Sequence, residues 1–362
     1  MMEQRVIISG GGTAGHLYPA LVVGKKLQQQ GIKITFVGST RKLEQSIMKH
    51  YNADFIPLKI EGIKGKGFLV IKSLFILPYS AIKSLLIIIN RRPALVIGMG
   101  GYSSGPIVLI SSLIGIPSLI MEQNLHPGLT NRILIPFAKK AVVAFKKSLP
   151  AFKGKGEFLG NPVREEFYSL KPKKREEHLT ILVFGGSQGS HFLNKKITMS
   201  LPLLKASRDR LEIFHQTGAK DLNWVKEQYE QNGFGSAEVS AFFFDIYEYF
   251  QRSDLIVCRS GATTIAELIA SQKPSILVPF SLSTENHQLL NARELERIKG
   301  AEIILEKDFT PGKFSSKITY FIDNKDTLNR MEKQLEQLKR EDTAEKIAAL
   351  CLGLMKNNKR RA

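Results

Sequence analysis

Short, almost continuous apolar runs alternate with segments of helical length along the whole chain. The runs "RVIISG", "KITFVGS" and "ALVIGMG" have the length of strands, and they contain Val, Ile and Leu without a regular polar alternation. Strands of this kind are buried on both faces, as they are in a parallel sheet that helices cover on both sides. The pattern therefore predicts an α/β protein.

The pattern stops once and then starts again. It breaks near "GNPVR" (160–164), and the charged stretch "KPKKREEH" follows from Lys171, after which strand-and-turn units resume. Each half contains a strand that runs into a glycine turn, "IISGGGTAGH" in the first and "LVFGGSQGSH" in the second. Because 362 residues exceed the size of one ordinary core, we predict two doubly wound parallel-sheet domains that face each other.

One uncharged passage, residues 94–121, has the length of a membrane span. Five glycines and two prolines interrupt it, so we predict a buried strand, a glycine loop, a short helix and a second buried strand instead. The start of the chain, "MMEQRVIISGGG", has no apolar stretch typical of a secretion signal. Two cysteines, Cys258 and Cys351, cannot form a disulfide framework, which favours a reducing compartment.

Charge adds a constraint on the partner. The chain has 52 Lys and Arg against 33 Asp and Glu, for a formal net charge of +19, and nucleic acid, anionic lipid or a phosphorylated metabolite would each fit that charge. A non-catalytic nucleic-acid binder would gather basic residues with exposed aromatics in one element. It would leave the glycine turns unexplained, so we do not expect nucleic acid as the partner.

The first glycine turn has the spacing of a dinucleotide-binding motif, with Gly10, Gly12 and Gly15. That motif also needs an acidic residue at the end of the second strand, where this chain has Gly38 and Ser39. A nicotinamide cofactor is therefore disfavoured. His16 follows the turn at the carboxyl end of a buried strand, where open α/β sheets bind ligands and where an imidazole suits proton transfer.

The second half offers two anion-binding turns. Ser187 lies within the turn Gly185–Gly189, and in the later stretch "CRSGATTIAELIA" Ser260 and Gly261 open a helix. A diphosphate at the first amides of that helix would place a sugar diol within reach of Glu267, one turn inside. Glu267 could also be an acid that only complements the helix dipole.

Two amide-rich clusters follow strands in the two halves: "EQN" (122–124) and "ENHQLLN", which contains His287, Gln288 and Asn291. Carboxamides donate and accept hydrogen bonds, which suits sugar hydroxyls, although these residue types are also common in loops and helix caps. The seven histidines show no paired ligand spacing, and no acidic pair follows a strand. We therefore expect no metal ion and no cofactor.

The motifs "GGTAGHLYPA", "GMGGYSSGP", "EQN" with "GLTNR", "GNPVR", "FGGSQGS", "CRSGATTIAEL" and "HQLLNA" occur in this order, and together they resemble the MurG family of bacterial glycosyltransferases. The resemblance covers most of the chain. It implies a GT-B fold, with two Rossmann-like domains on either side of a cleft. Residues 1–163 would form the acceptor and membrane-association domain, 164–340 the UDP-sugar domain, and 341–362 a helix that returns to the first domain.

The resemblance also implies a reaction. N-acetylglucosamine would move from UDP-N-acetylglucosamine to the C4 hydroxyl of the muramyl sugar of undecaprenyl-linked lipid I, with inversion and without a cofactor, to give lipid II. The enzyme would act in peptidoglycan synthesis at the cytoplasmic face of the bacterial inner membrane, as a peripheral protein, with cell-wall and division machinery as partners. Another UDP-sugar enzyme of the same fold, an epimerase or a transferase with a different acceptor, is the alternative.

Residues that match the family's donor site lie in both halves: Thr13, Ala14, Gly15, Asn124, Arg164, Ser187, Phe243, Ala262, Thr263, Thr264, Ile265, Ala266, Glu267 and Gln288. By resemblance, Ser187 would contact phosphate, Phe243 would lie near the uracil, Glu267 would hold the ribose and Gln288 the sugar. Arg164 and the helix N-termini would meet the charge that develops on UDP.

The catalytic base expected from the resemblance is His16, with Glu122 as the alternative. Tyr102, His287 and Asn291 would support the acceptor or the site around it. Two positions depart from the family: Met121 stands where members commonly have His, and three consecutive phenylalanines leave the match of Phe243 open by about one residue.

A further stretch, "IKGKGFLVIKSLFILPYSAIKSLLIIINRRP", surrounds apolar residues with basic ones, namely Lys64, Lys66, Lys72, Lys83, Arg91 and Arg92. Such a pattern favours contact with an anionic membrane face. An ordinary core helix with solvated lysines is the alternative interpretation.

Overall fold

The computed structural model describes residues 3–12, 14–59, 68–171, 177–283 and 286–359. The chain divides into two compact units, the first comprising 1–163 with 342–362, and the second comprising 164–341. These are the N-terminal unit and the C-terminal unit.

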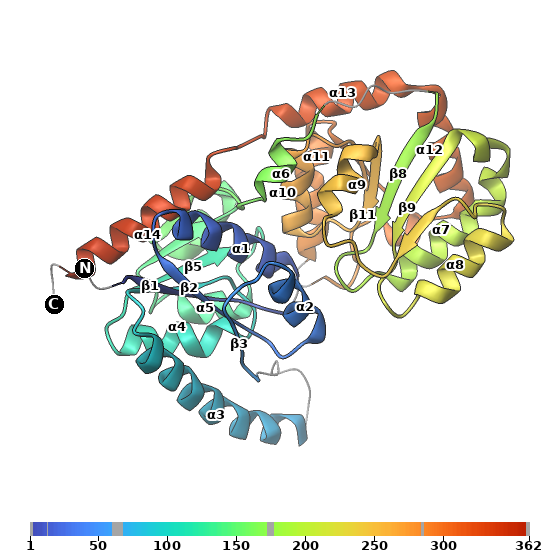
Figure 1. Ribbon diagram of the computed structural model, residues 1–362. Coiled ribbons are helices and arrows are strands. Elements are labelled where there is room, and N and C mark those ends of the chain that lie inside the picture. Colours follow the sequence, from blue (N-terminus) through green and yellow to red (C-terminus); the bar gives the residue numbers. More distant parts are fainter. Residues whose placement is uncertain (1–2, 13, 60–67, 172–176, 284–285, 360–362) are drawn as a thin grey trace. The chain divides into compact units, whose positions relative to one another are not determined.

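The N-terminal unit is built on a seven-stranded parallel sheet (Figure 1). In spatial order its strands are β3 (Phe55–Pro57), β2 (Lys33–Gly38), β1 (Arg5–Ser9), β4 (Leu95–Gly98), β5 (Ser118–Glu122), β6 (Lys140–Val143) and β7 (Gly156–Phe158). Ser9 at the end of β1 is in register with Val37 of β2 and with Gly98 of β4. The strand order reverses between β1 and β4, and the carboxyl ends of strands at such a point are where open α/β sheets bind ligands.

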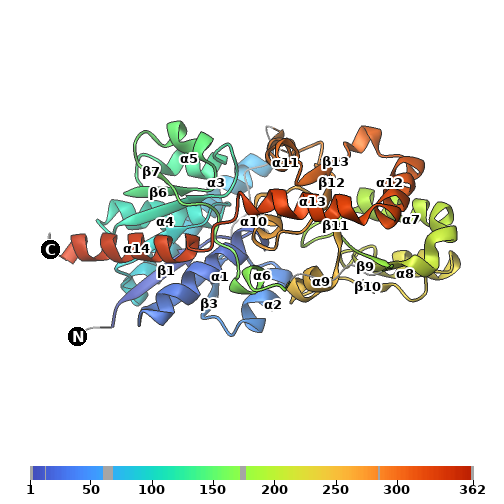
Figure 2. The same cartoon turned by 90° about the horizontal axis from the view of Figure 1, so that it is seen from above.

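Helices cover both faces of this sheet (Figures 1 and 2). One face carries α1 (Ala14–Gln29) and α14 (Thr343–Lys359), and the other carries α3 (Phe68–Arg91), α4 (Ser104–Leu113) and α5 (Leu129–Leu134). The helix α2 (Lys42–His50) follows β2, and the 3₁₀ segment η1 (Lys146–Phe152) precedes β7. An ion pair between Lys26 and Glu345, 2.5 Å long, joins α1 to α14.

Residues 94–121 fold as predicted, into β4, a glycine loop, α4 and β5. Their apolar side chains, among them Val96, Ile107, Val108 and Ile120, are buried in the core between the sheet and α4. In the part of the chain that the structure describes, we find no helix with the length and apolar character needed to cross a membrane.

The C-terminal unit has a six-stranded parallel sheet. Its strands, in spatial order, are β10 (Glu238–Ser240), β9 (Leu211–Gln216), β8 (Leu179–Phe184), β11 (Leu255–Cys258), β12 (Ser275–Leu277) and β13 (Ala301–Ile303). Its helices are α6 (Glu165–Tyr168), α7 (His191–Leu204), α8 (Leu222–Gln231), α9 (Ile246–Arg252), α10 (Ala262–Ala270), α11 (His287–Arg297), α12 (Pro311–Asp323) and α13 (Lys325–Glu336), with 3₁₀ segments η2 (Lys205–Arg210) and η4 (Glu306–Asp308).

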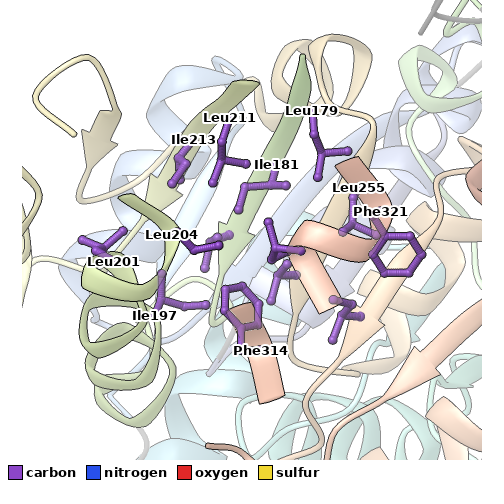
Figure 3. Close-up of a cluster of buried hydrophobic side chains, with 14 of the residues drawn as sticks. Leu179, Ile181, Ile197, Leu201, Leu204, Leu211, Ile213, Leu255, Phe314 and Phe321 are labelled. Carbon is purple, nitrogen blue, oxygen red and sulfur yellow. The ribbon is translucent and has the colours of Figure 1, made fainter. Parts of the chain in front are cut away.

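The core of this unit follows from strand periodicity. Leu179, Ile181 and Val183 alternate along β8 and belong to one buried cluster with side chains of α7 and α12, because every second residue of a strand points to the same face. Figure 3 shows Leu201 and Leu204 of α7 and Phe314 and Phe321 of α12 converging on the strands. Burying each such side chain contributes about 1.5–3 kcal/mol. The predicted α/β class with two parallel-sheet domains is confirmed.

Candidate functional site

The first glycine turn leads from β1 into α1, and residues of α2 and its N-cap hold it. The buried carboxylate of Glu44 accepts hydrogen bonds from the Gly12 amide (2.5 Å), the Ser39 amide (2.8 Å) and the Ser39 hydroxyl (2.6 Å). Arg41, the N-cap residue, donates through Nη1 to the Gly12 carbonyl. The Gly12 amide is thus used by a protein carboxylate, and a phosphate placed there would meet a negative charge. This arrangement opposes a dinucleotide-type phosphate contact at Gly12.

A second glycine loop, at the end of β4, packs against the first. Gly100 and Gly101 have φ of +88° and +75°, and a Cβ added at Gly101 would lie 2.4 Å from the Gly11 carbonyl oxygen. Only glycine permits both the left-handed conformation and this approach of two backbones. The "GMGGYSSGP" motif therefore brings the β4 loop against the turn that precedes His16.

His16 is a half-buried side chain in the first turns of α1. Its Nδ1 lies 3.2 Å from Oε1 of Gln123, the residue that follows β5. Burial lowers the pKa of His16 below its ordinary value, and the charge of Glu122 and the hydrogen bond to Gln123 oppose that shift only in part. A neutral imidazole at the carboxyl end of the sheet can accept a proton near neutral pH.

Glu122 ends β5, and protein donors already surround its carboxylate. Oε1 accepts from the Asn124 amide at 2.9 Å and from Asn124 Nδ2 at 3.2 Å. Oε2 accepts from the Gly128 amide and from Asn131 Nδ2, both at 2.9 Å. Both oxygens are therefore engaged in holding the loop that leads to α5. Met121, the residue before it, is a buried core side chain of the strand.

The remaining candidates of the N-terminal unit have different surroundings. Tyr102 is exposed, on the loop after β4, and Asn124 is half-buried beside Glu122. Ala14 and Gly15 begin α1, whereas Thr13 lies outside the described residues.

In the C-terminal unit the glycine turn after β8 is tightly packed. Gly186 and Gly189 have φ of +94° and +76°, and a Cβ on Gly189 would lie 1.9 Å from the Thr217 carbonyl oxygen. Ser187 is a half-buried residue within the turn. The next element, α7, is capped by the Ser190 hydroxyl, which accepts from the Leu193 amide.

Gln216, a buried residue that the sequence did not single out, joins this turn to the Phe243 loop. Its Nε2 donates to the Gly186 carbonyl (3.0 Å), and its Oε1 accepts from the Phe243 amide (2.8 Å). The Phe243 ring is buried and stacks on Tyr249 with a centroid distance of 3.8 Å. A nucleobase bound at this loop would therefore contact backbone groups rather than the Phe243 ring.

The N-terminus of α10 carries the third group of candidates. Gly261 precedes the helix and has no side chain to cap it, and the first amides of a helix have no partner within it. Ala262, Thr263 and Ile265 are buried, whereas Thr264 and Ala266 are half-buried.

Glu267 lies one turn inside α10 and pairs with Arg164, whose Nη2 is 3.5 Å from its Oε1. Both side chains are buried. Burial raises the pKa of Glu267 to about 7, and the charge of Arg164 opposes this rise only in part. Arg164 also donates to the Phe244 carbonyl at 3.3 Å, so it links Glu267 to the Phe243 loop.

Residues of α11 fix the turn before α10. The Ser260 hydroxyl donates to the Gln288 carbonyl (2.8 Å), and Asn291 Nδ2 donates to the Ser260 carbonyl (3.2 Å). Gln288 Oε1 accepts from the Phe280 amide (3.0 Å), and His287 is a half-buried residue at the start of the helix. Gln288 and Asn291 thus have structural partners, which their residue types alone did not reveal.

Arg259 is a second residue that sequence reasoning missed. Its buried guanidinium donates to the Ser190 hydroxyl (2.9 Å), the Val278 carbonyl (3.0 Å) and the Glu306 carboxylate (2.5 Å). It thereby connects the N-cap of α7 with the residue after β12 and with η4. Within the described ranges, no group of three His, Cys, Asp or Glu side chains is placed to hold a metal ion.

Two families match the chain in sequence. The glycosyltransferase family 28 N-terminal domain matches residues 6–143, and the glycosyltransferase family 28 C-terminal domain matches residues 180–347. Relatives from Myxococcus xanthus (strain DK1622) and Syntrophus aciditrophicus (strain SB) both carry the name UDP-N-acetylglucosamine--N-acetylmuramyl-(pentapeptide) pyrophosphoryl-undecaprenol N-acetylglucosamine transferase. The first is 37% identical over 97% of this chain and 93% of its own length. The second is 39% identical over 98% of this chain and 100% of its own length.

Solved structures share the fold. Acinetobacter baumannii MurG has a TM-score of 0.73 and 27% identity, over 97% of this chain and 99% of its own. A putative UDP-N-acetylglucosamine 2-epimerase from Listeria monocytogenes has a TM-score of 0.68 and 13% identity, over 96% of this chain and 95% of its own. The second likeness concerns the fold alone. The first, together with the two family matches, confirms the predicted GT-B class.

Proposed function

This chain belongs to the MurG family of glycosyltransferases, and from that membership we propose that it transfers N-acetylglucosamine from UDP-N-acetylglucosamine to lipid I. The observation that carries the proposal is the similarity over 97% of the chain to a relative named as this transferase. The product is lipid II, in which a β-1,4 bond joins the two sugars.

In this proposal the C-terminal unit binds the donor. The amides at the start of α10, with Ser187 in the glycine turn, bind the diphosphate, since a helix N-terminus attracts anions. Glu267 accepts hydrogen bonds from the ribose hydroxyls, Gln288 contacts the sugar, and backbone groups of the Phe243 loop contact the uracil. Arg164 acts through Glu267, because its 3.5 Å ion pair favours the ionised carboxylate. The charge that develops on UDP is met by the α10 amides.

The N-terminal unit handles the acceptor. His16 accepts the proton of the C4 hydroxyl as that oxygen bonds to the anomeric carbon of the donor, and the bond from that carbon to UDP breaks with its electrons. Attack on the face opposite UDP inverts the anomeric centre. Glu122 is a positioning residue in this proposal, because four donors from the loop after β5 and from α5 already occupy its carboxylate.

An apolar and basic surface on the N-terminal unit supports membrane contact. On α3, Tyr79, Ile82, Leu86 and Ile89 are exposed beside Lys83 and Arg92. Further exposed apolar residues lie on or beside α4 and α5: Leu113, Ile114, Leu129, Ile133 and Phe137. Large exposed apolar groups rimmed by cations suit an anionic bilayer, here the cytoplasmic face of the inner membrane, where lipid I would be bound. Lys64 and Lys66 lie outside the described residues.

The proposal is tested by UDP release from UDP-N-acetylglucosamine, measured with and without a soluble lipid I analogue. Wild-type protein should release UDP only with the analogue, and His16→Gln should lose that release while still binding UDP-N-acetylglucosamine. UDP release by the wild type without acceptor would instead indicate a hydrolase or an epimerase.

A further inference from the structure

We infer that Gln123 is a positioning residue for His16: its side-chain oxygen holds the imidazole in the tautomer with the proton on Nδ1, which leaves Nε2 as the base. The inference rests on the proposed function for its catalytic consequence. The tautomer itself is a property of the protein without substrate.

The contact between Gln123 and His16 determines which imidazole nitrogen carries the hydrogen. Gln123 Oε1 lies 3.2 Å from His16 Nδ1, and a carboxamide oxygen accepts but cannot donate. Nδ1 must therefore carry the hydrogen. A neutral imidazole has one N–H, so Nε2 then keeps the lone pair that a general base needs.

The backbone lies close to the same edge of the ring. A Cβ added at Gly100 would lie 3.2 Å from His16 Cε1 and 3.5 Å from Nδ1. A side chain at this position would crowd the imidazole where it contacts Gln123, so glycine leaves room for the contact.

Gln123 is rigidly placed for this role. It is 2% exposed, and its neighbours on both sides are joined by the bond from the Asn124 amide to Glu122 Oε1 (2.9 Å). Its own Nε2 has no hydrogen-bond partner among the described residues. In the described part of the chain, the hydrogen bond of the Gln123 side chain is the one to His16, and it is made through Oε1.

Burial and nearby charges set the pKa of His16, and so the fraction of the imidazole that is neutral. Glu122 and Glu44 are the carboxylates that act on His16, and both raise its pKa, whereas burial is the larger effect and lowers it. Near pH 7 the ring is thus largely neutral, and the choice between tautomers determines which nitrogen can take a proton. Glu122 and Glu44 are both engaged by backbone amides, so neither competes for Nδ1.

The test is nuclear magnetic resonance of the full chain labelled with ¹⁵N in histidine, at pH 8 and without substrate. The His16 signals are identified by their loss in His16→Gln. Wild type should show a protonated Nδ1 and an unprotonated Nε2. Gln123→Glu keeps an acceptor at the same reach and should keep that pattern, whereas Gln123→Leu should shift His16 toward the Nε2–H tautomer.

Activity provides a second readout. Gln123→Leu should lower kcat about 100-fold, the scale of general acid–base catalysis, with the Kd for UDP-N-acetylglucosamine unchanged. Gln123→Glu should retain most of the rate and move the acidic limb of the kcat profile to higher pH, because a carboxylate beside the ring raises its pKa. Gln45→Leu, an exposed site on α2, is the matched control and should behave as wild type in both measurements.

A wild-type His16 protonated on Nε2 would overturn the inference, and so would an unchanged tautomer in Gln123→Leu. If the tautomers follow the prediction but wild-type protein transfers no sugar to lipid I, the proposed function fails and the positioning of His16 by Gln123 stands.

Discussion

Arg164 and Glu267 form a buried ion pair in the C-terminal unit, with Nη2 of the arginine 3.5 Å from Oε1 of the glutamate. The pair joins the segment that enters the unit to the helix whose N-terminus is proposed to bind the diphosphate. Burial outweighs the attraction of Arg164, so the pKa of Glu267 rises from an ordinary 4.5 to about 7. The carboxylate proposed to bind the donor ribose is therefore the group whose charge changes near neutral pH.

Glu267 should make stability depend on pH. Between pH 4.5 and about 7 the folded protein keeps this proton while the unfolded chain has lost it, so the folded state binds more protons and becomes less stable as pH rises. Glu267→Gln should remove this contribution, which amounts to about 3 kcal/mol over the window at 1.36 kcal/mol per pH unit. Urea unfolding from pH 4.5 to 8 measures the free energy of unfolding of both proteins. The same pH dependence in wild type and Glu267→Gln would contradict the raised pKa.

Donor affinity should depend on the same carboxylate. Glu267→Gln should raise the Kd for UDP-N-acetylglucosamine at pH 8 about 10-fold or more, since hydrogen bonds to a charged group are worth about 1.5–3 kcal/mol. Isothermal titration calorimetry measures the change. Glu248→Gln, on the exposed side of α9, should bind as wild type. Equal affinity in Glu267→Gln would remove Glu267 from the ribose site.

Replacing Glu122 should lower the stability of the folded protein, whatever its effect on catalysis. Glu122→Gln would set an amide NH₂ against donors that now bond to the carboxylate, from Asn124, Gly128 and Asn131. Because each buried donor left unpaired costs about 1–3 kcal/mol, thermal unfolding should occur several degrees lower. His16→Gln should instead unfold near the wild-type temperature and lose transfer. A fully stable Glu122→Gln without activity would make Glu122 the better candidate for the base.

The glycine turn of the C-terminal unit should tolerate no side chain at Gly189. Its φ is +76°, and an added Cβ would lie 1.9 Å from the Thr217 carbonyl oxygen. Gly189→Ala should therefore displace the turn and weaken UDP binding at least about 10-fold, from strain on the order of 1–3 kcal/mol. Gly235→Ala, where a Cβ meets nothing within 4 Å, is the control. Equal UDP affinity in the two variants would exclude the turn from the donor site.

The membrane surface can be tested through α3. Ile82 and Leu86 are 61% and 52% exposed, and changing both to Glu should reduce sedimentation with vesicles of anionic phospholipid at least about 10-fold. Wild-type binding should weaken as salt rises, because screening reduces attraction between the basic rim and the lipid charge. Leu203→Glu, at a site on α7 that is 57% exposed, should bind normally. Salt-independent binding, or none, would contradict membrane contact.

The fold was predictable because buried parallel strands have a strong local signal. Val, Ile and Leu runs such as Leu179–Phe184 identify strands, and the glycines that follow them mark the carboxyl ends where turns form. The division of "ALVIGMGGYSSGP" into strand, loop and helix start likewise followed from glycine and proline. These features depend on residues that are close together in the sequence, so they can be predicted from it.

The site was only partly predictable, because its partners are distant in sequence. His16 stood out through its turn, but its contact Gln123 is 107 residues away. Glu44 fixes Gly12 across 32 residues, and nothing in "RKLEQ" indicates it. Arg259, Gln216 and the ion pair of Arg164 depend on which strand ends meet in space. Residue type predicted the chemistry, while tertiary packing determined which groups remain for substrate.

The proposed transfer is tested most directly by the structure of the product formed from UDP-N-acetylglucosamine and a lipid I analogue. Inverting transfer should give a lipid-linked disaccharide whose new anomeric proton has the coupling of a β linkage to C4 of the muramyl sugar, formed in equal amount to the UDP released. Free N-acetylglucosamine, its 2-epimer, or an α-linked product would contradict an inverting transfer to lipid I.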